Sequence, residues 1–234
     1  KGTINEKPLN YTNLLMVIIM GMNGLVLVTD LFSLYVFLEI TGIASFVLIA
    51  LFKSKEGLEG AFKYLLMSAV ATVFLLTSIA FIFMETGSLL YKDIATYLLS
   101  LNADTTSVFM LIAFMLFIAA VAVKSGMMPF HGWLPDAYQS APAAVSVLLG
   151  GLVTKVAGVY AIIRLMNYVF VGIPSISFAL GILALISIVF GAVAAVTQND
   201  FKRILAYSSI SQIGYIVLGA ACGNVLGFLG AVLH

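Results

Sequence analysis

The stretch SVFMLIAFMLFIAAVAV (residues 107–123), followed by KSGMMPFHGWLPDAYQSAP (residues 124–142), decides the fold of this chain. The first part is an uninterrupted apolar run, long enough to cross a hydrocarbon core about 30 Å thick. The second part contains three prolines, and proline removes a backbone donor and clashes with the preceding turn. A helix through this region must therefore break or kink. The prolines are Pro129, Pro135 and Pro142.

In hydrocarbon, broken backbone is tolerated only where protein buries it or where it lines a wet cavity. We favour a discontinuous transmembrane helix here, because Lys124 and His131 flank the break. The alternative is a helix that ends at Gly126 and a loop that leads to the next span.

Further apolar runs surround this segment, and 62% of the chain is hydrophobic while 9% is charged, against about 25% in soluble domains. The sequence therefore predicts an all-α polytopic membrane protein of seven to eight transmembrane helices. A β-barrel would show short alternating segments, which the sequence lacks. A charged connection at residues 53–59 precedes the third span, and a polar turn at residues 198–203 precedes the seventh. A short interfacial helix is expected at Tyr91–Leu101. The other predicted spans are 11–29, 31–52, 61–84, 143–166, 174–197 and 204–222, and an eighth begins after Gly223.

Composition also excludes several classes of site. The single cysteine, Cys222, excludes an internal disulfide and a cysteine-held metal or iron–sulfur site, and two histidines argue against a metal cluster. A net charge of +1 gives no reason to expect nucleic acid as a partner. The chain opens at Lys1 without a start methionine and stops at His234 as an apolar segment begins, so we expect an internal piece of a longer protein.

Orientation follows from the cations. If the spans alternate in direction, one side of the membrane collects seven cations and the other collects Lys92 and Arg164. The positive-inside rule then places the first side, with the N-terminal end, in the cytoplasm. We expect an integral protein of a prokaryotic cytoplasmic membrane. The seven cations are Lys1, Lys7, Lys53, Lys55, Lys63, Lys202 and Arg203.

Three ionisable side chains lie inside predicted spans: Glu39, Lys124 and Lys155. A charge at mid-membrane costs about 3 kcal/mol on insertion scales, so such residues are usually functional. A buried carboxylate must take up a proton or find a cation. An ion pair at 4 Å is worth about 4 kcal/mol at an effective dielectric constant of 20. A Glu–Lys pair whose separation changes can therefore act as a proton switch.

Structural roles are the alternative for each of these residues. Buried ion pairs also lock helices together, and a lysine near a span end can extend to the headgroups. Two lysines and one glutamate leave a surplus positive charge, which favours a proton relay over static pairing. A histidine can titrate near neutral pH and so take part in proton transfer, but His131 could equally be a loop residue bonded to nearby backbone. The polar run at residues 208–212 could hold water or bond neighbouring helices.

Several motifs together resemble the signature of the antiporter-like proton-translocating membrane subunits. This family includes the membrane-arm subunits of respiratory complex I, the Mrp sodium/proton antiporter subunits and the Mrp-like subunits of membrane-bound hydrogenases. Lys155 and Gln212 look more like the Mrp and hydrogenase branch than mitochondrial complex I. The resemblance covers nearly the whole chain. Its motifs are KSGMMPFHGWLPDA (124–137), SAP (140–142), VS (145–146), LFSLYVFLE (31–39), TKVAGVY (154–160) and KRILAYSSISQIG (202–214).

The resemblance implies a role for individual positions. Glu39 matches the family's glutamate on the fifth transmembrane helix, and Lys124 matches its partner lysine on the broken seventh helix. Lys155 matches the central lysine of the eighth helix, and His234 matches the first histidine of the eleventh. By this mapping, residues 1–170 hold the first five-helix repeat (family helices four to eight). Residues 171–234 begin the second, inverted repeat of a larger fourteen-helix fold.

The leading hypothesis is therefore a proton-translocating subunit of a respiratory-type membrane complex, with or without exchange for sodium. Protons would move through a Glu39–Lys124–Lys155–His234 relay. Its partners would be other membrane subunits of a complex I-like, hydrogenase or Mrp assembly, and no cofactor is expected in this chain. One alternative is a structural subunit that anchors soluble redox partners. A redox enzyme with its own quinone pocket is the third hypothesis.

Overall fold

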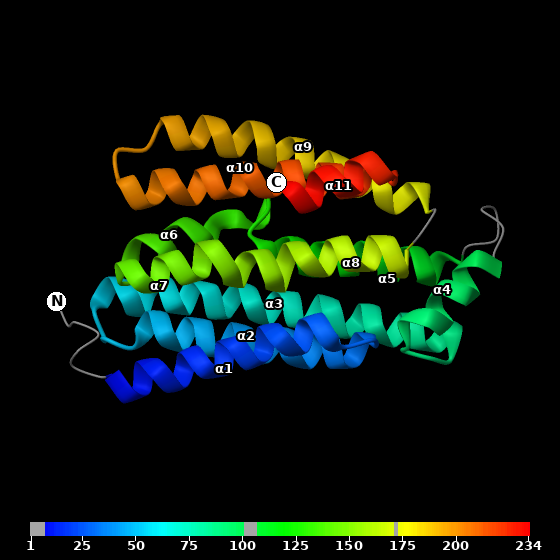
Figure 1. Ribbon diagram of the computed structural model, residues 1–234, viewed down its shortest axis with the longest axis horizontal. Helices are drawn as coiled ribbons and strands as arrows, with labels where there is room; N and C mark the ends of the chain where they lie inside the picture. Colours follow the sequence, from blue (N-terminus) through cyan, green and yellow to red (C-terminus); the bar gives the residue numbers. More distant parts are fainter. Residues whose placement is uncertain (1–7, 101–106, 171–172) are drawn as a thin grey trace.

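The computed structural model describes residues 8–100, 107–170 and 173–234, and the regular elements of these residues are all helices (Figure 1). A 3-10 turn (Phe130–Gly132) and two π-helical segments (Leu149–Val153 and Lys155–Tyr160) interrupt the α-helices. The predicted all-α class is confirmed. The α-helices are α1 (Pro8–Leu27), α2 (Leu31–Ala50), α3 (Lys55–Thr86), α4 (Tyr91–Ser100), α5 (Val108–Ser125), α6 (Trp133–Ser140), α7 (Ala143–Leu148), α8 (Ala161–Tyr168), α9 (Pro174–Val196), α10 (Phe201–Ala221) and α11 (Val225–Leu233).

Within the described ranges, seven segments are long and apolar enough to cross a bilayer, as predicted. Five of them are the single helices α1, α2, α3, α9 and α10. The fourth segment, Val108–Ser140, joins α5 to α6 across the predicted break, and the fifth, Ala143–Tyr168, joins α7 to α8 through the π-helical segments. Helix α11 begins at Val225, where the predicted eighth span begins.

Side-chain oxygens cap the N-termini of several helices. Each accepts a hydrogen bond from a backbone N–H three residues later, which satisfies a donor that the first turn leaves unpaired. For example, Asp30 Oδ1 lies 2.7 Å from the Ser33 nitrogen at the start of α2. These caps explain why the helices begin where they do. The capping residues are Asp30 (α2), Ser54 (α3), Ser107 (α5), Asp200 (α10) and Asn224 (α11).

Three helices begin earlier than the sequence predicted, and the first of them, α1, begins at Pro8 instead of residue 11. α3 begins at Lys55, inside the predicted charged connection, and α10 begins at Phe201, inside the predicted polar turn. The 32 residues of α3 span about 48 Å, which exceeds the hydrocarbon thickness. The charges therefore mark the end of the apolar layer and not the end of the helix. The short helix predicted at Tyr91–Leu101 is present as α4, although its predicted last residue lies outside the described residues. Its interfacial position stays a prediction.

The helices run side by side along the long axis, and α5–α8 lie between α1–α3 and the pair α9–α10 (Figure 1). The α2–α3, α6–α7 and α9–α10 connections lie at one end of the bundle, which we call the basic end. Lys1 and Lys7 lie outside the described residues. So does the predicted boundary between residues 170 and 171, and the division into two repeats stays a prediction. The cations at or near the basic end are Lys53, Lys55, Lys63, Lys202 and Arg203.

Arg164 was predicted to lie near the end of the fifth span, on the side of the membrane opposite the seven cations. The residue lies inside α8, and its guanidinium donates hydrogen bonds to the carbonyls of Leu25 and Val26 in the last turn of α1. It also donates to the Tyr160 hydroxyl at 3.2 Å. A cation is favourable at this position because the carbonyl end of a helix carries a partial negative charge.

The surface of the bundle is apolar, and several of its interior contacts are polar. Met84 and Val196 are 76% and 87% exposed, as expected where lipid is the solvent. Inside, the Ser78 hydroxyl donates to the Ala113 carbonyl at 2.7 Å, which joins α3 to α5. The Ser211 hydroxyl likewise joins α10 to α9. Small polar side chains therefore connect the helices, because burial of apolar surface does not drive their association in lipid.

Close contact between α5 and the second π-helical segment depends on Gly158. A Cβ at this position would lie 2.4 Å from the Cβ and 2.6 Å from the Cα of Ser125. Since Ser125 is the last residue of α5, this contact brings the segment that carries Lys155 against the end of the helix that carries Lys124.

We expect Gly158→Ala to lower the free energy of unfolding by about 1–3 kcal/mol, because the added methyl group would force backbone apart. The control is Gly151→Ala in the other π-helical segment, where an added Cβ would have no neighbour within 4 Å. Thermal unfolding of the purified protein measures both variants. Equal loss of stability in the two would contradict the packing role of Gly158.

Candidate functional site

The predicted pair of Glu39 and Lys124 is formed in the structure. Lys124 Nζ lies 2.7 Å from Glu39 Oε1, and the lysine side chain is 3% exposed while the glutamate side chain is 20% exposed. Glu39 comes from the middle of α2 and Lys124 from the last turn of α5. The two charges therefore compensate each other inside the spans.

Helix α3 supplies hydroxyl groups to both members of this pair. Lys124 Nζ donates to Ser68 Oγ at 2.7 Å, and Thr72 Oγ1 donates to Glu39 Oε1 at 2.7 Å. Gly42 of α2 also lies beside the ammonium group, since a Cβ at this position would be 3.6 Å from Lys124 Nζ. The site is thus built from three helices, and each charge keeps a neutral polar partner beside its ionic one.

The helix break immediately follows Lys124. Gly126 takes a left-handed conformation (φ 72°) and ends α5, and its N–H bonds the Val123 carbonyl at 3.1 Å. That carbonyl also accepts a hydrogen bond from Trp133 Nε1 at 3.0 Å. The Met128 N–H donates a hydrogen bond to Ser187 Oγ of α9, also at 3.0 Å. Protein groups therefore satisfy the broken backbone, as a break at membrane depth requires.

The break also favours a cation at position 124. A helix carries a partial negative charge at its carbonyl end, and Lys124 lies in the last turn of α5. Both this end charge and Glu39 stabilise the ammonium group, which offsets part of the cost of burying it.

Lys155 lies in the second π-helical segment, a type of helix that is frequent at functional sites. Its Nζ donates to Ser209 Oγ of α10 at 2.9 Å. The hydroxyl of Tyr138 lies 3.2 Å from Thr154 Oγ1 and also interacts with Ser209. Among the residues that the structure describes, Lys155 therefore has a hydroxyl partner and no carboxylate.

His234 follows α11 and faces the same helix α10. Its Nε2 lies 2.5 Å from Gln212 Oε1, and its ring centroid is 5.9 Å from that of Tyr215. Ser209 and Gln212 are three residues apart, so they lie on one face of α10. This face connects the surroundings of Lys155 to those of His234.

His131 lies in the 3-10 turn after the break. Its Nδ1 is 3.3 Å from the Pro129 carbonyl, and its ring is 5.9 Å from that of Tyr207. This is the backbone contact expected of a loop residue. A part for His131 in proton transfer stays a prediction.

The structure joins Glu39 to Lys124 directly, Lys155 to Ser209, and His234 to Gln212. Within the described ranges, no hydrogen bond joins Lys124 to Lys155, although their segments pack together at Gly158. The relay role of these residues stays a prediction.

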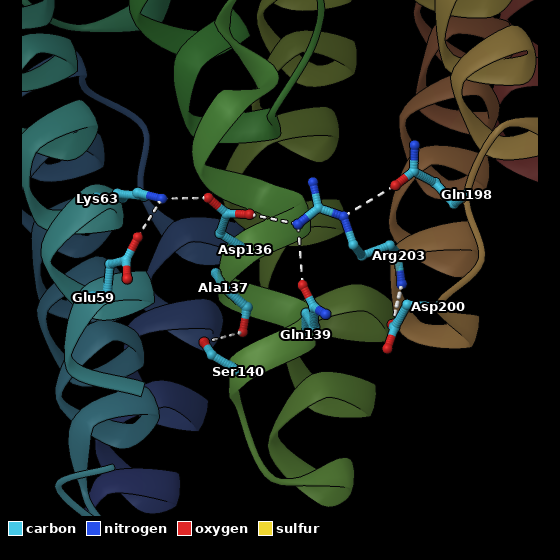
Figure 2. A network of polar contacts seen from close by, with 9 residues as sticks. All are labelled: Glu59, Lys63, Asp136, Ala137, Gln139, Ser140, Gln198, Asp200 and Arg203. Atoms are coloured by element: carbon cyan, nitrogen blue, oxygen red, sulfur yellow. Dashed lines mark hydrogen bonds and ion pairs between the residues drawn. The ribbon is translucent and has the colours of Figure 1, made fainter. Parts of the chain in front are cut away.

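Sequence reasoning missed two groups of residues. It did not identify Ser68 and Thr72, which look like ordinary residues of an apolar span. It also missed a charged cluster at the basic end, which we call the Asp136 network and which consists of Lys63, Asp136 and Arg203 (Figure 2). The signal available for this network was one carboxylate in a segment between prolines and a pair of cations at residues 202–203.

This chain is similar in sequence to known membrane proteins over most of its length. The profile of the family described as "NADH:quinone oxidoreductase/Mrp antiporter, TM" matches residues 28–234. NADH-quinone oxidoreductase subunit N of Desulforudis audaxviator is 40% identical over 217 residues, which cover 92% of this chain and 42% of that protein. The D subunit of the Na(+)/H(+) antiporter of Alkalihalophilus pseudofirmus is also 40% identical, over 92% of this chain and 43% of that protein. This chain thus spans less than half the length of either relative.

A solved structure of another membrane protein has a similar fold. A chain of the membrane-bound sulfane sulfur reductase, an archaeal respiratory membrane complex, superposes with a TM-score of 0.81 at 33% identity. The match covers 90% of this chain and 43% of that chain.

We expect Lys124→Met to lower the free energy of unfolding by about 3 kcal/mol, because it leaves the Glu39 carboxylate without its cation. The double variant Glu39→Gln, Lys124→Met should lose less than the sum of the two single losses. Lys92→Met, which removes an exposed lysine on α4, is the matched control and should change little. Unfolding in detergent measures the cycle, and strictly additive losses would show that the two side chains are not coupled.

Proposed function

Because the chain belongs to the NADH:quinone oxidoreductase/Mrp antiporter transmembrane family, we propose that it is part of a proton-translocating, antiporter-like subunit of a multi-subunit membrane complex. The names of its relatives support this proposal, since they denote subunits of a quinone oxidoreductase and of a sodium/proton antiporter. The partners would be other membrane subunits of such a complex. The proposal covers proton transfer with or without sodium exchange, since relatives of both kinds match equally well.

The observation that carries the proposal is the buried Glu39–Lys124 pair at the helix break. Its 2.7 Å contact is worth several kcal/mol at an effective dielectric constant of about 20. Lengthening the contact weakens the electrostatic stabilisation of the Lys124 ammonium group, because Glu39 is the carboxylate paired with it. A break beside Lys124 gives the lysine a point at which the backbone can move without breaking a continuous helix.

The proposed transfer runs from Lys124 to Lys155 and then toward His234. When the contact with Glu39 opens, the Lys124 ammonium group loses a proton and becomes an amine. A neutral Lys155 receives the proton through water and becomes the ammonium group. Ser209 and Gln212 would line the path from Lys155 to His234 along α10, since Ser209 bonds Lys155 and Gln212 bonds His234.

The basic end is proposed to face the cytoplasm. Five cations lie at or near this end, and cytoplasmic loops of membrane proteins carry an excess of lysine and arginine. The N-terminus of α1 lies at the same end, so it would also be cytoplasmic (Figure 1).

Transport by the assembled complex in sealed vesicles tests the relay. We expect Glu39→Gln and Lys124→Met each to reduce proton transport at least about a hundredfold, because each removes a charge that the switch requires. Lys92→Met, on the exposed face of α4, should leave the rate unchanged. Rates are normalised to the amount of assembled complex. Parental rates in both site variants would refute the assignment.

Lys155 distinguishes the relay from a subunit that only anchors partners. We expect Lys155→Met to assemble normally but to lose transport, because a thioether cannot carry a proton. Lys155→Arg should also transport poorly, since a guanidinium stays protonated. If Lys155→Met instead lowers thermal stability while transport per assembled complex is retained, the structural hypothesis is correct.

A further inference from the structure

Asp136 joins two separate parts of the bundle. Its Oδ2 lies 2.6 Å from Lys63 Nζ of α3, and its Oδ1 lies 2.8 Å from an Nη of Arg203 of α10 (Figure 2). Each carboxylate oxygen thus serves a different helix. The three side chains are between 27% and 42% exposed and line a cleft of about 790 Å³ at the basic end.

The contact between α6 and α3 is close at the backbone level. A Cβ at Gly60 would lie 2.4 Å from Ser140 Oγ and 3.1 Å from the Asp136 carbonyl oxygen. Gly60 lies three residues before Lys63 on α3. Packing at Gly60 and the ion pair with Lys63 therefore fix one side of α6.

The opposite side of α6 is held by the first turn of α10. The Arg203 guanidinium also donates to Gln139 Oε1 at 3.0 Å, and Lys202 Nζ donates to the Ala141 carbonyl at 2.5 Å. Cations are unfavourable at the N-terminus of their own helix because the macrodipole is positive there. Negative charge at this end comes from Asp200, the N-cap of α10, and from Asp136 and the Ala141 carbonyl on the side of α6. The two helices therefore depend on each other electrostatically.

Two of the three helices joined by Asp136 also carry the hydroxyl groups that contact the buried lysines. α3 holds Ser68, five residues after Lys63 and bonded to Lys124. α10 holds Ser209, six residues after Arg203 and bonded to Lys155. α6 is itself the second half of the broken helix. At 1.5 Å per residue, these hydroxyl groups lie within about 10 Å, along their helices, of the cations bound by Asp136.

We propose that Asp136 is a positioning residue for proton transfer: by bridging Lys63 and Arg203, it aligns α3 and α10 on the broken helix and so sets Ser68 against Lys124 and Ser209 against Lys155. This inference rests on the proposed function. It assigns Asp136 no proton of its own to carry.

Four variants of the full complex test this role. Asp136→Asn removes the charge at nearly constant shape, whereas Asp136→Glu keeps the charge. Asp136→Asn is also combined with Arg203→Gln. Glu59→Gln is the matched control, because Glu59 binds Lys63 at 2.8 Å from the same helix and does not contact Asp136. Proton transport per assembled complex and hydrogen–deuterium exchange of the α6 amides are measured for each.

We expect Asp136→Asn to reduce transport about tenfold, which is the scale of effect of residues that act through a network. The same variant should speed hydrogen–deuterium exchange of the α6 amides. Asp136→Glu and Glu59→Gln should stay within about twofold of the parent in transport, with unchanged exchange. The double variant should transport no worse than Asp136→Asn alone, because both substitutions disable one network.

Parental transport in Asp136→Asn would overturn the inference, and so would a double variant that transports clearly less than Asp136→Asn alone. Glu39→Gln, measured alongside, separates the two proposals. If Glu39→Gln is inactive while Asp136→Asn is normal, the relay stands and only the positioning role fails. If both transport like the parent, the proposed function fails, and the positioning role fails with it.

Discussion

The constraint on which the structure depends is that a backbone without water must find its hydrogen bonds within the protein. A broken helix at membrane depth leaves donors and acceptors that only protein groups can satisfy. Here Trp133 bonds the Val123 carbonyl, and Ser187 bonds the Met128 N–H. These contacts hold the half-helices α5 and α6 in place, and with them the lysine that precedes the break.

The same constraint organises the charges. Lys124 is buried because it has Glu39, a hydroxyl group and the carbonyl end of α5 around it. Lys155 has a hydroxyl group and no carboxylate within the described ranges, so the two lysines occupy different electrostatic surroundings. In the proposed relay, a difference of this kind would give a proton a direction of travel when the surroundings change. Static pairing would not require it.

The sequence predicted the spans and the break because hydropathy and proline report directly on burial and on backbone geometry. It also selected Glu39 and Lys124, since charges inside apolar runs are conspicuous. It did not identify Ser68, Thr72 or the ion pairs of Asp136. Serine and threonine are common in membrane helices, and their partners depend on helix rotation and tilt, which composition does not encode. The early start of α3 was missed because charge indicates the edge of the membrane and not the end of a helix.

The bond between Met128 and Ser187 has a consequence for biosynthesis. The two residues are 59 positions apart, so α5 leaves the ribosome well before α9 can supply its hydroxyl group. Until then, the newly inserted half must keep the Met128 amide wet or shielded, since exposure to acyl chains would cost several kcal/mol. The backbone of the break therefore reaches its final set of hydrogen bonds only after α9 has joined the earlier helices.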